Sequence, residues 1–254
     1  MKRIAVIPAR WASSRLPGKV LADIAGAPMI RRVWECARGS GVDRVLIAAD
    51  DARVRDVCLG FGAEVVMTDA DLPSGTDRIA QALDRTGCGA DALVVNVQGD
   101  EPLLPPGHID AVMRVLIESG APMATLAEPL RDQAALGALA SADVVKVVCD
   151  RAGRALYFSR AAIPHARDAD AAPPAEALRH IGLYAYRFEY LRRFVALGEA
   201  ELERTERLEQ LRALAAGDAI AVGLVEPADT PGGVDTAEDL ERVRAHWASA
   251  SRGD

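Results

Sequence analysis

Cationic and hydroxyl side chains gather in one short segment, residues 9–19, with the sequence ARWASSRLPGK. The segment contains Arg10, Arg15 and Lys19 and follows an apolar run at residues 4–8. In open α/β sheets, ligands bind beyond the carboxyl ends of the strands. Phosphates need fixed cationic donors and nearby backbone N–H groups. The segment therefore indicates an anion site, although a solvated basic loop would have the same composition.

Two familiar phosphate-binding patterns are missing from this position. Neither G-x-x-x-x-G-K-[ST] nor G-x-G-x-x-G follows the first apolar run. The sequence thus gives no support to a P-loop nucleotidase or to a nicotinamide-dependent oxidoreductase.

Carboxylates occur in two further segments that could do chemistry. Asp100 lies in QGDEP, at the end of another apolar run, and Asp235 lies in GGVDTAEDL. Mg²⁺ prefers oxygen ligands and commonly uses one or two carboxylates together with substrate phosphates. Taken alone, each segment has a plainer interpretation, because Asp, Gly and Pro close strands and Asp and Thr cap helices.

The elements that position these residues alternate in type through the first half of the chain. Apolar runs predict strands at residues 4–8, 44–49, 64–67 and 92–97, and helical periodicity predicts helices at residues 28–38, 51–60 and 76–86. This alternation predicts an α/β fold, a three-layer doubly wound and mainly parallel sheet.

The second half is less regular. Residues 144–149 and 155–159 predict a hairpin that forms a small lobe, and residues 181–186 and 220–225 predict two more strands. Helices are predicted at residues 108–119, 206–216 and 236–247, the last with Thr236 and Asp239 as an approximate capping pair. We expect one domain over residues 1–254.

Composition excludes several classes of protein. The formal charge of −7 and the lack of a basic block argue against nucleic-acid binding. No stretch approaches eighteen apolar residues, and no leader pattern precedes the first strand, so we expect a cytoplasmic protein without a membrane span. The four cysteines are widely spaced and predict neither a zinc site nor disulfides.

Taken together, the motifs resemble those of one family, the 3-deoxy-manno-octulosonate (Kdo) cytidylyltransferases. The opening pattern I-P-A-R-x-x-S-[ST]-R-L-P-G-K-x-L is complete over residues 7–21, and the segments around Asp100 and Asp235 match the family's QGDEP and VDTxEDL. Further matches are SGTDR at 74–78, YFSR at 157–160, IP at 163–164, LRHIG at 178–182 and LEQLR at 208–212. They follow family order along nearly the whole chain.

The resemblance implies a nucleotide-diphospho-sugar transferase type of fold and a reaction between CTP and the acidic sugar Kdo, with Mg²⁺ as cofactor and a homodimer as the assembly. It implies that residues 1–130 mainly bind the nucleotide and that residues 131–230 bind the sugar and form the dimer. The implied catalytic residues are Arg10, Lys19, Asp100 and Asp235, and the last two would carry the metal. The implied nucleotide-binding residues are Ala9, Arg10, Ser13, Lys19, Ser74, Arg78 and Gln98.

For the sugar pocket the resemblance implies Arg160, His180, Tyr184, Glu209 and Gln210. Arg160 would pair with the carboxylate of the sugar, because a guanidinium suits planar, two-point recognition of a carboxylate. Without the resemblance, the other four would be interpreted as ordinary core or surface residues.

The chain departs from the family pattern between Pro164 and Leu178. This segment is short and rich in Ala and Pro, and it carries His165 where relatives often have an aromatic residue. Three other interpretations stay open. They are a cytidylyltransferase for sialic acid, 8-amino-Kdo or methylerythritol phosphate, a catalytically silent nucleotide-binding module, and, least supported, an oxidoreductase.

Overall fold

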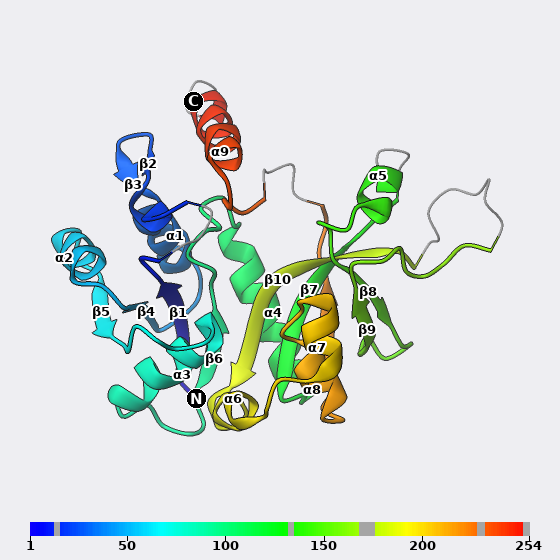
Figure 1. Cartoon of the computed structure of the whole chain (residues 1–254). Coiled ribbons are helices and arrows are strands. Elements are labelled where there is room, and N and C mark those ends of the chain that lie inside the picture. Colours follow the sequence, from blue (N-terminus) through cyan, green and yellow to red (C-terminus); the bar gives the residue numbers. More distant parts are fainter. Residues whose placement is uncertain (13–15, 132–134, 168–175, 228–231, 251–254) are drawn as a thin grey trace. The chain divides into compact units, whose positions relative to one another are not determined.

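The computed structural model describes residues 1–12, 16–131, 135–167, 176–227 and 232–250. The chain divides into two compact units. The first unit contains residues 1–110 and 228–254, and the second contains residues 111–227. Figure 1 labels the elements of both units. The predicted functional halves, residues 1–130 and 131–230, stay a prediction.

A parallel sheet forms the centre of the first unit. Its strands are β1 (Arg3–Ala9), β4 (Arg44–Ala49), β5 (Glu64–Met67) and β6 (Leu93–Asn96). They lie in the order β6-β1-β4-β5, and every neighbouring pair is parallel. The predicted strands are confirmed here to within about a residue at each end.

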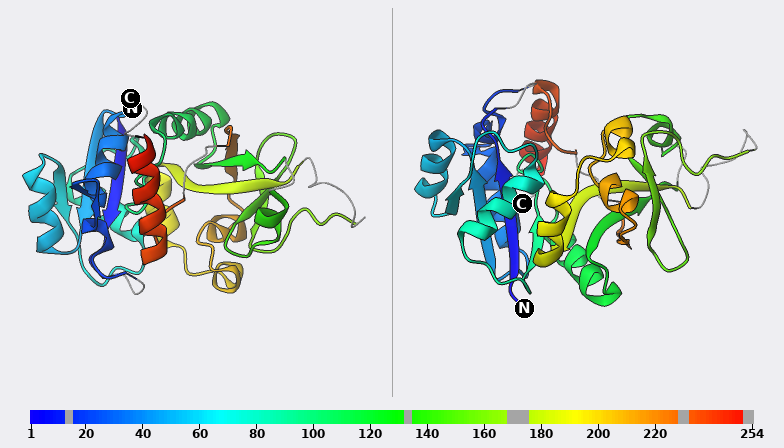
Figure 2. Two further views of the ribbon diagram at one scale, coloured as in Figure 1. Left: turned by 90° about the horizontal axis from the view of Figure 1, so that it is seen from above. Right: turned by 60° about the horizontal axis from the view of Figure 1, so that its bottom comes forward.

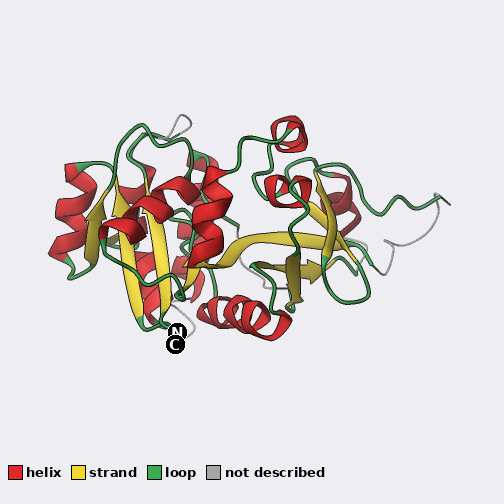
Figure 3. Cartoon of the chain, turned by 90° about the horizontal axis from the view of Figure 1, so that it is seen from below, coloured by secondary structure: helices red, strands yellow, loops and turns green. Residues whose placement is uncertain are grey.

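Helices α1 (Met29–Arg38), α2 (Ala52–Gly60) and α3 (Gly75–Arg85) connect these strands. The chain first moves outward from β1 to β4 and β5, and α3 then returns it to β6 on the far side of β1. Because such crossovers are right-handed, α3 lies on the opposite face from α1 and α2. Figure 3 shows helices on both faces of these strands. The predicted doubly wound fold is confirmed.

Burial explains the apolar strand sequences. Ile4, Val6, Leu46 and Val94 are each at most 1% exposed. A strand that is covered on both faces must be apolar along its whole length rather than at alternate residues. The order of strands reverses between β1 and β6, and the carboxyl ends at such a switch point open a crevice for ligands.

The final segment of the chain returns to this unit. Helix α9 (Ala237–Ala250) packs Leu240 and Val243 against Ile24 and Met29, which come from β2 (Asp23–Ile24) and the start of α1. Figure 2 shows α9 beside these N-terminal elements. The short hairpin of β2 with β3 (Ala27–Pro28) and the 3-10 turn η1 (Lys19–Leu21) complete the unit.

The second unit has a mixed sheet. Its strands lie in the order β11 (Ile220–Leu224), β7 (Met123–Pro129), β10 (Leu178–Arg187), β8 (Lys146–Cys149) and β9 (Ala155–Ser159). The predicted hairpin is confirmed, because β8 and β9 pair antiparallel through a turn at residues 150–153. Helix α4 (Pro106–Ser119) spans the boundary of the two units.

One predicted helix is wrong in its extent. Residues 206–216 do not form a single helix, because α7 (Glu201–Glu206) ends at Arg207, whose φ of 57° is left-handed. A new helix, α8 (Leu211–Ala215), begins after the break. Strand β7 and the helices α5 (Ala135–Ala140) and α6 (Phe188–Ala196) were not predicted. No helix in the described ranges has the length and apolar character needed to cross a bilayer.

Candidate active site

A cavity of about 320 Å³ lies in the first unit at the carboxyl ends of β1 and β6. Strand β1 contributes the loop that carries Arg10, and strand β6 contributes the loop that carries Asp100. The lining residues are Pro8, Arg10, Ala12, Lys19, Val20, Gly75, Gln98, Gly99, Asp100 and Asp235. Five predicted site residues therefore share one cavity at the switch point of the sheet.

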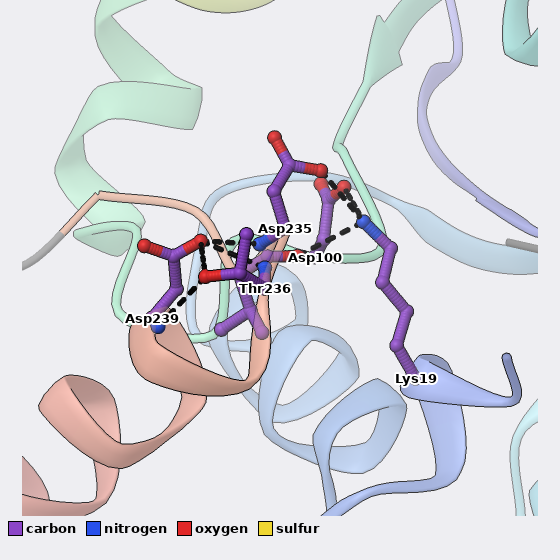
Figure 4. Close-up of polar contacts among 6 residues, drawn as sticks. Lys19, Asp100, Asp235, Thr236 and Asp239 are labelled. Atoms are coloured by element: carbon purple, nitrogen blue, oxygen red, sulfur yellow. Dashed lines mark hydrogen bonds and ion pairs between the residues drawn. The ribbon is translucent and has the colours of Figure 1, made fainter. Parts of the chain in front are cut away.

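The centre of this cavity is an ion cluster. Lys19 Nζ lies 2.6 Å from Asp100 Oδ2 and 3.1 Å from Asp235 Oδ1, and it also donates to the backbone oxygen of Val234 (Figure 4). Burial alone would lower the pKa of Lys19, but the two carboxylates outweigh it and raise the pKa. The cluster brings together side chains separated by 81 and 216 residues.

Local backbone contacts hold Asp235 in position. Val234 N donates to Asp100 O at 2.8 Å, so the two carboxylate-bearing segments are joined directly. Asp239 Oδ2 accepts from the backbone N–H groups of Asp235 and Thr236, and Thr236 Oγ1 accepts from Asp239 N. The predicted capping pair at the start of α9 is confirmed, and it also orients Asp235 (Figure 4).

The donor set fits a magnesium ion that is shared with a substrate. Asp100 and Asp235 reach the same ammonium, so one cation could contact both carboxylates. Among the described residues no group of three or more His, Cys, Asp and Glu side chains could hold a metal. A pair of carboxylates completed by phosphate oxygens is the arrangement that Mg²⁺ commonly uses.

The strand ends pack closely beside the cavity. A Cβ on Gly99 would lie 2.7 Å from Pro8 O, so the loop after β6 can approach β1 only with glycine at this position. Gly75 opens α3 on the rim of the same cavity. The N-terminus of a helix favours anions through its free N–H groups and its dipole.

Three other predicted nucleotide-binding residues are not among the residues that line this cavity. Ala9 is completely buried in β1, and Arg78 is 0% exposed, with its guanidinium beside Asp50 and hydrogen-bonded to Thr68. Ser74 caps α3, because its hydroxyl accepts from Thr76 N and Asp77 N. Ser13 lies outside the described residues. The contacts of Arg78 and Ser74 stabilise the fold, and the roles of these residues in nucleotide binding remain predictions.

Asp50 links Arg78 to the loop that follows β1. Its Oδ1 accepts from Trp11 N at 2.9 Å, while its Oδ2 lies 3.2 Å from Arg78 Nη2. Burial lowers the pKa of Arg78, and the charge of Asp50 opposes this effect. A buried ion pair at the base of the loop therefore fixes the point where the loop leaves β1.

The predicted sugar-binding residues gather in the second unit. The rings of His180 and Tyr184 lie 5.4 Å apart on β10, and Glu209 is close enough to Tyr184 to raise the pKa of its hydroxyl further, beyond the larger effect of burial. Gln210 is 4% exposed, and its Nε2 has no hydrogen-bond partner among the described residues. An unpaired buried donor is costly, so this amide is suited to bind a ligand oxygen.

Arg160 is held by its own surroundings. Its backbone N–H donates to Glu206 Oε2 at 2.9 Å, and its Nε donates to the backbone oxygen of Glu206 at 2.8 Å. Lys146 is 0% exposed and donates to the backbone oxygens of Ser141, Val144 and Arg160. The end of β9 is thus fixed from two sides.

Comparisons with known proteins agree with this geometry. A family profile described as cytidylyltransferase matches residues 4–220. Two curated proteins named 3-deoxy-manno-octulosonate cytidylyltransferase, from Pseudomonas fluorescens and Pseudomonas syringae pv. tomato, are 54% and 55% identical over 246 residues, which cover 94% of this chain and 95% of each relative.

The chain belongs to the 3-deoxy-manno-octulosonate cytidylyltransferases. A solved structure of CMP:2-keto-3-deoxy-manno-octonic acid synthetase complexed with CTP agrees, with a TM-score of 0.89 and 41% identity over 98% of this chain and 100% of that chain. A nucleotidyl transferase from Methanothermobacter, at 17% identity and a TM-score of 0.60 over 98% of this chain and 99% of that one, shares the fold. The chain is therefore a nucleotidyltransferase, as predicted.

Sequence reasoning missed three charged residues that contact predicted site residues, one in the first unit and two in the second. Asp50, Lys146 and Glu206 touch predicted site residues through buried or half-buried hydrogen bonds and ion pairs. A carboxylate directly after an apolar strand run was a usable signal for Asp50. Lys146 and Glu206 gave no signal, because charged residues in a strand and a helix are ordinary in sequence and only their partners reveal them.

Proposed function

We propose that the chain transfers CMP from CTP to the anomeric hydroxyl of Kdo and releases pyrophosphate. The observation that carries the proposal is the cluster of Lys19, Asp100 and Asp235 in a cavity beside Arg10. The product, CMP-Kdo, would serve lipopolysaccharide biosynthesis. We further propose that the enzyme acts in the cytoplasm as a homodimer, on the basis of family resemblance.

Transfer needs positioning and charge neutralisation rather than a covalent enzyme intermediate. The sugar oxygen forms a bond to the α-phosphorus, the bond from this phosphorus to the bridging oxygen of the β-phosphate breaks, and the hydroxyl proton is released to solvent. Arg10 and Lys19 would hold the triphosphate. Arg160 would hold the sugar carboxylate, and Gln210 would donate to a sugar oxygen.

Asp100 and Asp235 would hold Mg²⁺ when CTP binds. The ion would neutralise phosphate charge and lower the pKa of the attacking hydroxyl. The charge of the cluster favours the binding of a divalent cation. Within the cluster, the one ammonium of Lys19 balances only one of the two carboxylates, so these three side chains together keep one negative charge for a divalent cation.

The decisive experiment measures pyrophosphate release from CTP with and without Kdo, first in Mg²⁺ and then in excess EDTA. We expect release only when CTP, Kdo and Mg²⁺ are all present. Release with sialic acid or 8-amino-Kdo in place of Kdo would change the assigned sugar but keep the reaction. Binding of CTP without release for any sugar would favour the silent nucleotide-binding module.

A further inference from the structure

A buried hydroxyl on β7 lies among three hydrogen-bonding groups of β10. Thr125 is 0% exposed. Its Oγ1 lies 2.8 Å from Leu183 O, 3.0 Å from Ile181 O and 3.0 Å from His180 Nε2. The two carbonyls belong to the place between Ile181 and Tyr184 where the register of β10 against β7 shifts. One threonine thus contacts both an irregularity of the strand and a predicted sugar-binding ring.

The number of hydrogens decides which atom donates. A hydroxyl has one hydrogen and can accept through its lone pairs, whereas a carbonyl oxygen can only accept. If Thr125 donated to His180 Nε2, two carbonyl oxygens would face lone pairs of Oγ1 at 2.8 and 3.0 Å with no hydrogen between them. If Thr125 donates to a carbonyl, His180 Nε2 must carry a hydrogen and donate to Oγ1.

The surroundings of the ring agree with a neutral imidazole. Burial lowers the pKa of His180 to about 3. A neutral ring with its hydrogen on Nε2 has a bare Nδ1, which accepts hydrogen bonds. No hydrogen bond from a described residue reaches this Nδ1. The edge of Phe158, with ring centroids 5.0 Å apart, and the ring of Tyr184 further restrict the imidazole.

We propose that Thr125 is a positioning residue that fixes His180 in the Nε2–H tautomer and so presents Nδ1 as an acceptor for a hydroxyl group of the acidic sugar. This inference rests on the proposed function, which places His180 in the sugar pocket. It assigns the sugar contact a direction, because the sugar must donate the hydrogen. An analogue with an ether in place of the donating hydroxyl would lose the contact.

The test combines nitrogen-15 NMR of the histidine rings with kinetics on the full chain. Wild type, Thr125→Val and Thr125→Ser are compared at pH 7, and the His180 signals are identified by their loss in His180→Gln among the four histidines of the chain. We expect wild type and Thr125→Ser to show a protonated Nε2 and a bare Nδ1. Thr125→Val, which is similar in shape but has no hydroxyl, should show a mixture of tautomers.

The kinetic readout separates positioning from general damage. Thr125→Val should raise KM for Kdo in inverse proportion to the fraction of His180 rings that keep the Nε2–H tautomer, about twofold when half of them keep it. KM for CTP should stay unchanged. Thr125→Ser should restore KM for Kdo.

Two results would overturn the proposal. One is a wild-type His180 protonated on Nδ1, which can be measured even if Thr125→Val fails to fold. The other is a Thr125→Val enzyme with both tautomer and KM for Kdo unchanged. A wild type that binds CTP but never uses Kdo would instead overturn the proposed function and the sugar contact with it, while the NMR result would still decide the tautomer.

Discussion

At the residue scale, the two carboxylates of the ion cluster have separable consequences for binding and turnover. Asp100→Asn and Asp235→Asn should each reduce turnover about 100-fold or more, since removing one electrostatic contact to a transition state has effects of this size. The affinity for CTP should fall much less, because Arg10 and Lys19 remain. Steady-state kinetics and CTP titration measure the two quantities.

A matched control for these variants is Asp56→Asn. Asp56 is an exposed aspartate on α2, with a side chain 64% accessible, and it lies outside the cavity. It should behave as wild type in both assays. Near-normal turnover in either cluster variant would contradict the assignment of the metal site.

His180 should also make the folded state sensitive to acid. Its pKa is about 3 in the folded chain and about 6.5 when unfolded, so between these values the unfolded state binds more protons. The free energy of unfolding should therefore fall as pH drops below about 6.5. For a fully buried ring, the free energy of unfolding would fall by about 2 kcal/mol from pH 7 to pH 5. We expect a fall of about 1 kcal/mol, because the His180 side chain is partly exposed and solvent screens its charge.

Urea unfolding at pH 7 and pH 5 measures this effect. The His180→Gln variant should lose about 1 kcal/mol less between these pH values than wild type does. An equal loss in the two proteins would show that His180 titrates normally in the folded chain.

At the element scale, the start of α9 orients Asp235 as well as beginning a helix. Asp239→Ala removes the acceptor for the N–H groups of Asp235 and Thr236, so it should destabilise the fold by about 1 kcal/mol. It should also raise the Mg²⁺ concentration needed for half-maximal activity. Glu238→Ala, an exposed neighbour in the same turn, is the control and should leave the Mg²⁺ dependence unchanged.

The end of α7 has a similar double role toward the sugar pocket. Glu206 accepts from Ser159 Oγ at 2.6 Å and from Arg160 N at 2.9 Å. Glu206→Gln keeps the shape but weakens these charge-assisted bonds, so KM for Kdo should rise about tenfold while KM for CTP stays the same.

Glu201→Gln is the control that tests whether removing any negative charge from α7 is enough to raise KM for Kdo. Glu201 is exposed on the same helix and pairs with Arg204. This variant should match wild type in both KM values. A parallel rise in KM for CTP in Glu206→Gln would show that the change also affects nucleotide binding and is not a local effect on Arg160.

The elements also show where sequence reasoning succeeded and where it stopped. The apolar runs of β1 and β4 predicted their strands well, because strands covered on both faces leave an uninterrupted pattern. The break at Arg207 was missed because a left-handed residue other than glycine has no sequence signature. Motifs identified Asp100 and Asp235, whereas Thr125 and Glu206 depend on contacts between segments far apart in the chain.

At the scale of the whole molecule, the first unit is closed by residues from both ends of the chain. Leu240 is 7% exposed and packs in the cluster of Ile24, Met29 and Val243. Leu240→Ala should destabilise this unit by about 2–3 kcal/mol, from the lost burial and the cavity left behind.

Thermal unfolding and kinetics together test this contribution. The midpoint should fall for Leu240→Ala and stay unchanged for Leu202→Ala, since Leu202 is 42% exposed. At a temperature well below the midpoint of thermal unfolding, turnover should remain near wild type, because the substitution alters no residue of the ion cluster. An unchanged midpoint for Leu240→Ala would show that α9 is not needed for the stability of the unit.

The late position of Asp235 has a consequence for synthesis on the ribosome. Lys19 and Asp100 belong to the first half of the chain, yet their third partner is 216 residues beyond Lys19. A nascent polypeptide that has already folded its parallel strands still has only one of the two carboxylates of the ion cluster. Translation must pass codon 235 before the cluster can form, so prematurely terminated products that end earlier would lack one of its two carboxylates even when their sheet is intact.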